Sequence, residues 1–412
     1  MEEVQKFKIR MEANRVFTPS APVDEKALFA GRAAQVNQVL DAVTQRGQHA
    51  IIHGERGVGK TSLANVLAPW LEAAGQTVLA PHVNCDGSDT FSSIWRKIFS
   101  EIHLSHRTRR PGFLGEEQVR AVELSQQLSD PITPDDVRKT LASIGWHALL
   151  IMIVDEFDRV TSSSDRKLFA DTIKTLSDHS VRATVVLVGV ADDVDHLIEE
   201  HQSIQRAIIQ IHLPRMAPAE LKEIVRKGLQ RLDGMDIESA ALERIALLSQ
   251  GLPHYTHLLA LHAVRAAIDR SQKGIMINDV DFAIKYALDG AQQTIRHAYH
   301  SGTASPQRGN LYTEVLLACA LARTDEMGYF AAADVRGPIR QVTGKDYDIP
   351  SFAQHLNAFC ENSRGPVLQK SGVKHRFRFR FCNPLMQPYV IMRGFAEGRL
   401  KSGTLGDPER VG

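Results

Sequence analysis

Gly54-Glu55-Arg56-Gly57-Val58-Gly59-Lys60-Thr61 is a glycine-rich stretch with the pattern G-x-x-x-x-G-K-T of a Walker A phosphate loop. The apolar residues 50–53 before it predict a short buried strand, and residues 62–67 after it predict a helix. In that context the glycines let backbone N–H groups surround a phosphate, and the helix N-terminus adds a partial positive charge. The stretch therefore predicts a nucleotide site.

The expected contacts follow from the chemistry of such a loop. Lys60 would reach the β- and γ-phosphates, and the Thr61 hydroxyl would ligate Mg²⁺. We therefore predict ATP and Mg²⁺ as cofactors. The predicted nucleotide-binding residues of this stretch are Gly54, Glu55, Arg56, Gly57, Val58, Gly59, Lys60, Thr61 and Ser62.

The composition is that of an ordinary globular protein. The chain has 412 residues, enough for two or three domains, and 43% of them are hydrophobic. The net charge is +1, so any basic binding surface has to be local. The four cysteines form no C-x-x-C pair, which fits free thiols in a reducing cytosol. Because no apolar run approaches the ~20 residues of a membrane span, we expect a cytoplasmic protein without membrane contact.

An acidic pair follows a continuous apolar run. Residues 148–154 are typical of a strand buried on both faces of a parallel sheet, and Asp155-Glu156 comes directly after them. Asp155 is placed to hold Mg²⁺, directly or through water. Because strand side chains alternate, Glu156 points elsewhere and can polarise a water for attack on the γ-phosphate. With a phosphate loop upstream, this pair predicts hydrolysis rather than binding alone.

Strands that alternate with helices predict a parallel α/β sheet with helices on both faces. The five strands are expected at about 50–53, 77–83, 148–154, 183–190 and 208–213. Residues 217–290 lack strand patterns and predict three or four amphipathic helices, whereas residues 1–30 carry few helix or strand signals. Residues 107–112 are basic and rich in helix breakers, which indicates either a solvated loop or a contact for phosphates or a partner.

Residues 365–381 predict a β-hairpin with its turn at Ser371-Gly372. In its second strand, three phenylalanines share one face and three arginines the other. The phenylalanines would cover helices near 309–323, 331–342 and 350–362, which is winged-helix order. The ridge of basic residues comprises Lys370, Lys374, Arg376, Arg378 and Arg380. It either contacts DNA phosphates or keeps the edge strand of a protein-binding module soluble, and the recognition helix carries no Arg or Lys for base readout.

These motifs together resemble an AAA+ ATPase. Their order is most similar to the branch that contains origin-recognition initiator ATPases, and to the related STAND signal-transduction ATPases, over roughly residues 28–390. The resemblance implies an α/β P-loop NTPase fold with a helical lid and a C-terminal winged-helix-like domain. The implied divisions are an N-terminal extension at 1–27, the core at 28–215, the lid at 216–298, a linker at 299–306, the winged-helix-like domain at 307–400 and a flexible tail at 401–412.

Three further matches refine the resemblance. The element ending in Gly31-Arg32 resembles the G-R element near the adenine in both families, which implies that these two residues bind the cofactor. Arg206 precedes the last strand, where AAA+ proteins carry an arginine finger; it would either reach the nucleotide of a neighbouring subunit or remain a surface arginine. Pro253-His254 follows Gly251-Leu252 as in the G-L-P element of STAND proteins, which implies that Pro253 packs on the base and His254 takes the sensor position.

The main functional hypothesis is a slowly hydrolysing ATP switch. Lys60, Glu156 and Arg206 would act in catalysis, and nucleotide state would control homo-oligomerisation and an output on double-stranded DNA or a DNA-acting partner. Slow turnover is expected because both sensor positions are irregular: His254 stands where initiators place a sensor-2 arginine, and the sensor-1 position lacks Asn or Thr and offers Asp192 or Asp193 instead. One alternative is a STAND-like regulatory ATPase in stress or anti-phage signalling, whose winged module binds an effector protein. Another is a transposition-type target selector that assembles on DNA.

Overall fold

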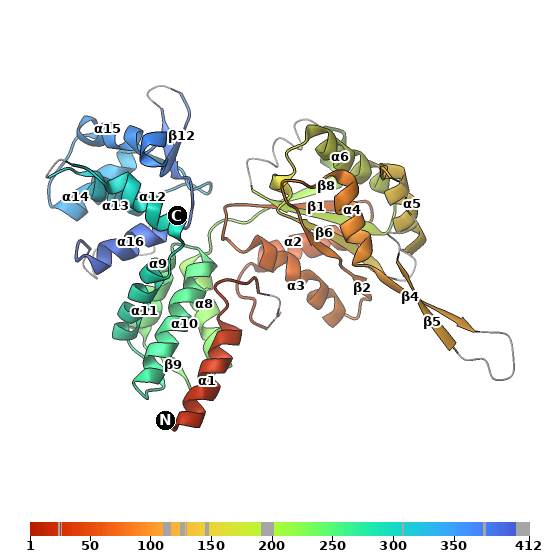
Figure 1. Cartoon of the computed structure of the whole chain (residues 1–412), viewed down its shortest axis with the longest axis horizontal. Helices are drawn as coiled ribbons and strands as arrows, with labels where there is room; N and C mark the ends of the chain where they lie inside the picture. The colour runs from red at the N-terminus through yellow and green to blue at the C-terminus, as the bar shows by residue number, and fades with distance from the viewer. Residues whose placement is uncertain are drawn as a thin grey trace.

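The computed structural model of the chain describes residues 1–23, 25, 27–109, 117–123, 128, 130–144, 148–190, 202–306, 309–373 and 376–400. An α/β core lies on one side of the molecule, and two helical parts lie on the other (Figure 1). No helix among these residues combines the length and the apolar character that crossing a membrane requires.

The core is a parallel sheet in the strand order β2-β6-β7-β1-β8, as the alternation of strands and helices predicts. Its strands are β1 (His49–His53), β2 (Val78–Leu79), β3 (His82–Asn84), β6 (Leu149–Asp155), β7 (Ala183–Gly189) and β8 (Ile208–His212). The single strand expected at 77–83 is instead divided into β2 and β3, which both pair with β6. Pro81 stands between the two pieces, and proline cannot donate a hydrogen bond to the ladder.

Helices cover both faces of the sheet because alternate strand residues face opposite sides. In β1, Ile52 packs into the cluster that contains α2 and α3, while Ile51 packs into the cluster that contains α4, α5 and α6. These helices are α2 (Ala33–Thr44), α3 (Lys60–Ala73), α4 (Phe91–Ser100), α5 (Pro134–Ile144) and α6 (Ser163–Asp178). The sheet is therefore buried on both faces, which explains its continuous apolar runs.

A two-stranded hairpin extends from the core between α4 and α5 (Figure 1). Strands β4 (His103–Arg109) and β5 (Glu117–Glu123) pair antiparallel from His103↔Glu123 to Arg109↔Glu117. The basic stretch at 107–112 is thus not simply a loop, since its first three residues belong to β4. Residues 110–112 lie outside the described part of the chain.

The first helical part, called the lid here, consists of α8 (Pro218–Gln230), α9 (Ser239–Ser249), α10 (Pro253–Asp269) and α11 (Ile277–Asp289). Helix α1 (Glu3–Val16) packs against α10, although it precedes the core in sequence (Figure 1). The expectation of little regular structure before residue 30 is therefore wrong for these residues. Ile9, Ala13 and Val16 are buried at i, i+4 and i+7, a helical spacing that the sequence did contain.

The second helical part, called the C-terminal module here, has winged-helix order. It contains α12 (Gln293–Thr303), α13 (Tyr312–Leu321), β11 (Phe330–Ala331), η4 (Ala332–Val335), α14 (Arg336–Thr343), α15 (Ile349–Ala358), β12 (Leu368–Ser371), β13 (Arg378–Phe381) and α16 (Met386–Ala396). Helix α12 continues to Thr303, so it occupies part of the expected linker. Phe379 and Phe381 are buried under the helices, as the alternation in the hairpin predicts.

Candidate functional site

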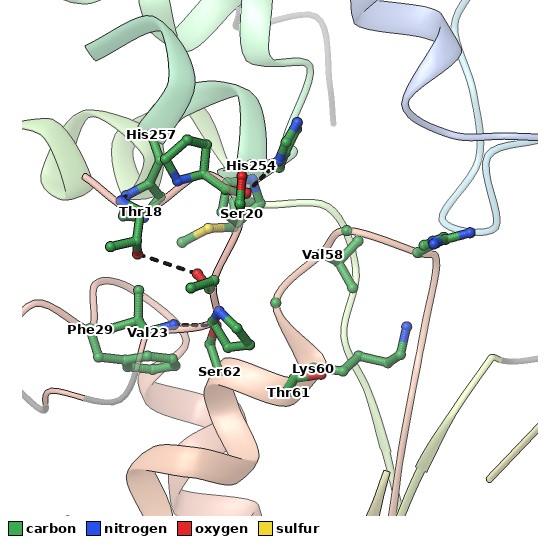
Figure 2. A pocket seen from close by; sticks show the side chains of 18 of the residues that line it. Thr18, Ser20, Val23, Phe29, Val58, Lys60, Thr61, Ser62, His254 and His257 are labelled. Atoms are coloured by element: carbon green, nitrogen blue, oxygen red, sulfur yellow. Dashed lines mark hydrogen bonds between the residues drawn. The ribbon is translucent and has the colours of Figure 1, made fainter. Parts of the chain in front are cut away.

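A cavity of about 580 Å³ lies where the phosphate loop, α10 and the N-terminal segment meet (Figure 2). The predicted site residues that line it are Arg32, Arg56, Gly57, Val58, Gly59, Lys60, Thr61, Ser62, Asp155, Glu156, Pro253 and His254. Three other predicted residues, Gly31, Gly54 and Glu55, do not line it. The fold thus gathers residues from sequence positions 32 to 254 around one cavity of the size of a small-ligand site.

The phosphate loop adopts the left-handed turns that its glycines allow. Gly57 and Gly59 have φ of 87° and 98°, and α3 begins directly after them at Lys60. The ammonium of Lys60 donates to the carbonyls of Gly54 at 3.0 Å and Glu55 at 2.9 Å. Burial lowers the pKa of Lys60 from its usual value, although Asp158 nearby favours the charged form. The loop therefore holds one buried cation beside a helix N-terminus, which is a site for an anion.

Asp155 and Thr61 meet across the sheet, although 94 residues separate them. The Thr61 hydroxyl donates to Oδ2 of Asp155 at 2.6 Å, and the Glu156 N–H donates to Oδ1 at 2.7 Å. His82 Nε2 lies 3.6 Å from Oδ2. Burial raises the pKa of Asp155, but hydrogen bonds from His82, Thr61 and the Glu156 N–H outweigh it, so the net pKa is lowered. The carboxylate and the hydroxyl supply oxygen donors of the kind that Mg²⁺ prefers.

Glu156 is the first residue after strand β6 and does not continue its extended backbone. Its backbone is left-handed, with φ of 53°, because β6 ends at Asp155 and a short 3₁₀ turn follows. Its carboxylate is about half exposed and pairs with Arg159 at 2.9 Å. Glu156 therefore stands at the cavity edge with access to water, but held by a cation of its own turn.

Arg32 is a buried structural element of the cavity wall. It has a left-handed backbone, with φ of 61°, and its guanidinium donates to the carbonyls of Val58, at 3.2 Å, and Pro214. Its backbone N–H donates to Glu220 of α8 at 2.8 Å, and the N–H of Gly31 donates to Glu223 at 3.2 Å. The Gly31-Arg32 element thus joins the phosphate loop to the lid.

Pro253 and His254 begin α10 and face the phosphate loop. A Cβ placed on Gly59 would lie 3.9 Å from Pro253 Cγ. His254 Nδ1 lies 2.7 Å from the carbonyl oxygen of Pro19, so this nitrogen carries the proton. Burial lowers the pKa of His254, which keeps the ring neutral. The histidine in the expected sensor position is therefore already bonded to the N-terminal segment.

Residues 18–23 form one wall of the cavity, which the sequence did not predict. The Val23 N–H donates to the Ser62 hydroxyl at 3.0 Å, and the Thr18 N–H donates to Nδ1 of His257 at 3.3 Å (Figure 2). Pro19 and Pro22 disfavour a helix here, but nothing in the sequence indicates what the segment contacts. Asp158 and Leu385 also line the cavity without having been predicted.

The remaining predicted residues lie away from the cavity. Arg206 belongs to the 3₁₀ turn before β8, is exposed, and pairs with Asp178 at 3.2 Å. Because Ile208 pairs with His49 at the start of β1, Arg206 lies at the end of the sheet opposite the phosphate loop. Asp192 and Asp193, the residues at the sensor-1 position, lie outside the described part of the chain, as does Lys374.

Two of the three hairpin arginines contact residues of their own module. Arg378 pairs with Asp325 at 2.7 Å, and the Arg380 guanidinium lies 4.7 Å from the ring centre of Tyr329. Lys370 lies 4.4 Å from the ring centre of Phe377, while Arg376 is exposed. In the sheet order β11-β13-β12, Arg378 and Arg380 are on the central strand, so these two arginines do not protect an edge.

The phosphate loop after β1, with Asp155 at the end of β6 and a helical lid over the cavity, defines a P-loop NTPase. The family profile described as Novel STAND NTPase 1 (nSTAND1) matches residues 21–294, which is more than half of the chain. The chain therefore belongs to the nSTAND1 family of nucleotide-binding NTPases.

Two curated relatives are initiator-type proteins. The chain is 24% identical over 255 residues to the ORC1-type DNA replication protein 2 of Thermoplasma acidophilum, a match covering 58% of this chain and 57% of that protein. It is 20% identical over 278 residues to the ORC1-type DNA replication protein of Thermoplasma volcanium, covering 65% and 64%. The match thus spans less than two thirds of the length of either relative.

A solved structure shows the same fold. The ORC2 protein of Aeropyrum pernix, determined as ADPNP and ADP complexes, superposes with a TM-score of 0.50 at 15% identity. The superposition covers 93% of this chain and 98% of that one, so it includes the C-terminal module. The AAA+ core with a winged-helix-like module is therefore the fold of this chain.

Proposed function

We propose that the chain is an ATP switch that hydrolyses slowly and couples its nucleotide state to self-assembly and to DNA or a DNA-acting partner. The observation that carries the proposal is the meeting of Lys60, Thr61 and Asp155 in one cavity. The loop amides and Lys60 would hold the phosphates, and Thr61 with Asp155 would hold Mg²⁺, which would neutralise charge on the phosphates.

The other end of the cavity suits a base. Val23 and Phe29 lie on one side, and the neutral His254 lies on the other (Figure 2), while Pro253 also lines the cavity. Apolar walls with a few backbone polar groups are typical of such sites. Glu156 would orient the attacking water after its ion pair with Arg159 has opened. We expect slow turnover because His254, in place of an arginine, supplies no charge from the lid.

Arg206 would act between subunits. It lies on the surface far from the phosphate loop of its own chain, so only the nucleotide of a neighbour is within its reach. Its partner Asp178 is also partly exposed, and surface ion pairs of this kind are weak enough to exchange. An arginine supplied by a neighbouring subunit would stabilise negative charge in the transition state, and hydrolysis would then depend on assembly.

The DNA output is supported by the names of the curated relatives, both DNA replication proteins, and by the basic hairpin. The competing proposal is a STAND-type regulator whose C-terminal module binds an effector protein. It is supported by the nSTAND1 match and by the internal pairing of Arg378 with Asp325.

ATPase measurements with and without duplex DNA at low salt separate the two proposals. DNA output predicts stimulation, which the triple change Arg376→Ala, Arg378→Ala, Arg380→Ala removes while basal turnover stays intact. An ATPase rate that does not respond to DNA at low salt, where phosphate contacts are strongest, would reject the DNA output and favour the STAND-type regulator that binds a protein. Failure to bind any nucleotide would reject both.

A further inference from the structure

The outer side of the phosphate loop contacts the C-terminal module. The side chain of Glu55 turns away from the cavity, and its Oε2 accepts a hydrogen bond from Arg215 Nε at 2.6 Å. Both side chains are largely buried, at 12% and 19% exposure. An ion pair withdrawn from water in this way is held more firmly than the surface pairs of the chain.

Arg215 touches three parts of the molecule at once. It follows β8 and precedes α8, so it lies in the connection between core and lid. Besides Glu55, its guanidinium donates to the Gln250 carbonyl at 3.2 Å and to the side-chain oxygen of Gln387 in α16. Gln387 is 4% exposed, and its amide nitrogen donates to the Ala320 carbonyl at 2.8 Å. Core, lid and C-terminal module therefore meet at one guanidinium.

Two packing contacts reinforce this junction. A Cβ on Gly328, in the turn before β11, would lie 2.1 Å from Oε1 of Glu55, so a larger residue there would require the Glu55 carboxylate to move. A Cβ on Gly57 would lie 3.3 Å from Cδ2 of Leu385, which also lines the cavity. The Leu385 carbonyl in turn accepts from the Tyr255 hydroxyl of the lid at 2.7 Å.

Glu55 also has an inner contact. Its carbonyl is one of the two acceptors that hold the Lys60 ammonium, at 2.9 Å. A phosphate that draws Lys60 away removes this bond from the peptide whose side chain Arg215 holds. The same residue is thus connected to the ligand-binding lysine on one side and to α16 on the other.

We propose that Arg215 is a positioning residue of the phosphate loop and that, through Gln387, it couples nucleotide occupancy directly to the C-terminal module. The coupling rests on the nucleotide function proposed above, and it acts beside any movement of the lid. Because such coupling is reciprocal, a partner that pulls α16 away changes nucleotide affinity by the same factor.

The direct test uses the full chain and Gln387→Leu, which removes the amide but keeps a similar volume. Hydrogen exchange of residues 383–393 is measured without nucleotide, with ADP and with a non-hydrolysable ATP analogue. In the wild type the analogue should speed exchange there. In Gln387→Leu this response should vanish, and analogue affinity should change by about fivefold or more, the lower end of measured site couplings. Arg215→Lys, which keeps the charge but not the forked geometry, should lose the response as well.

Several outcomes overturn the proposal. One is a wild type that binds the analogue without any change at 383–393. Another is a variant that responds like the wild type, or one that only lowers the melting temperature. If the wild type binds no nucleotide, the proposed function itself fails, which is a different result.

A glycine pair provides a second test should Gln387→Leu not fold. Gly328→Ala and Gly344→Ala carry the same backbone penalty, since their φ values are 77° and 71°. A Cβ on Gly328 would meet Glu55, whereas no atom of the described residues lies within 4 Å of a Cβ on Gly344. We expect Gly328→Ala to shift nucleotide affinity by about fivefold or more and Gly344→Ala to leave it unchanged. Equal affinities in the two variants would reject the coupling.

Discussion

The cavity and the β12–β13 hairpin both carry basic side chains, but they hold them in different ways. Lys60 donates to two neutral carbonyls, whereas Arg378 is paired with a carboxylate at 2.7 Å. A phosphate can replace a carbonyl without breaking an ion pair, but it must displace Asp325 to reach Arg378. The comparison indicates that the cavity is preorganised for an anion, while the hairpin must first give up a contact within its own module.

The largest expected effect is on turnover in the cavity. Glu156→Gln removes the carboxylate proposed to orient the water and should lower the ATPase rate by about 10²–10⁴-fold, the range for general acid–base groups. Nucleotide affinity should stay near that of the wild type, as measured by titration calorimetry. The trapped ATP form should also assemble, as seen by sizing. A monomeric trapped form would reject the role of Arg206 between subunits.

Lys60→Ala sharpens the contrast between the two basic regions. It should weaken ATP binding by about a hundredfold, near the upper end for a hydrogen bond to a charged group. Arg378→Ala is the matched control in the hairpin and should leave ATP affinity unchanged, as measured with a fluorescent ATP analogue. Equal losses in both variants would mean that the effect on affinity is a general loss of stability.

Acid should affect the cavity wall through a neutral histidine. His257 accepts the Thr18 N–H at Nδ1, and burial lowers its pKa from a usual 6.5 to about 4. His49 accepts the Val185 N–H, and burial lowers its pKa to about 4 as well. Between pH 4 and pH 6.5 these histidines bind more protons in the unfolded chain than in the folded one. Their contribution to the free energy of unfolding is therefore complete above pH 6.5 and is lost as the pH falls toward 4. Each histidine should lower the free energy of unfolding by about 2 kcal/mol at pH 5, relative to its value well above pH 6.5.

Thermal unfolding at a series of pH values measures this loss. His257→Gln should flatten the part of the profile between pH 6.5 and 4 that belongs to His257. His179→Gln, at an exposed position, serves as the control and should leave the profile unchanged. A profile that His257→Gln does not alter would show that the wall beside Thr18 does not depend on a neutral ring.

The smallest expected effect is at the hairpin. Asp325→Asn removes the partner of Arg378, and a partly exposed ion pair of this kind contributes under about 1 kcal/mol to stability. If the hairpin contacts DNA, the variant should bind duplex DNA more tightly. The slope of the logarithm of its binding constant against the logarithm of the salt concentration should steepen by about 0.9, for one added phosphate contact. An unchanged slope would favour a module that contacts protein.

The sequence predicted the sheet because its strands carry local signals. Continuous apolar runs at β6 and β7 indicate strands buried on both faces, and the glycine pattern specifies the loop after β1. The same local reasoning placed Asp155 at a strand end, and the structure then brings its carboxylate to the Thr61 hydroxyl. Helix α1 was missed although Ile9, Ala13 and Val16 have helical spacing, because its polar composition weakens the periodic signal.

The groups that would bind phosphate can be identified from the sequence, since the loop pattern and a strand-end carboxylate are local features. Which distant segments complete the site depends on the packing of the folded chain. Residues 18–23 close one wall, and Arg215 joins Glu55, 160 residues before it, to Gln387, 172 residues after it. Hydrogen bonds between segments so far apart depend on how the three parts pack, and that packing leaves no periodic or motif signal in the chain.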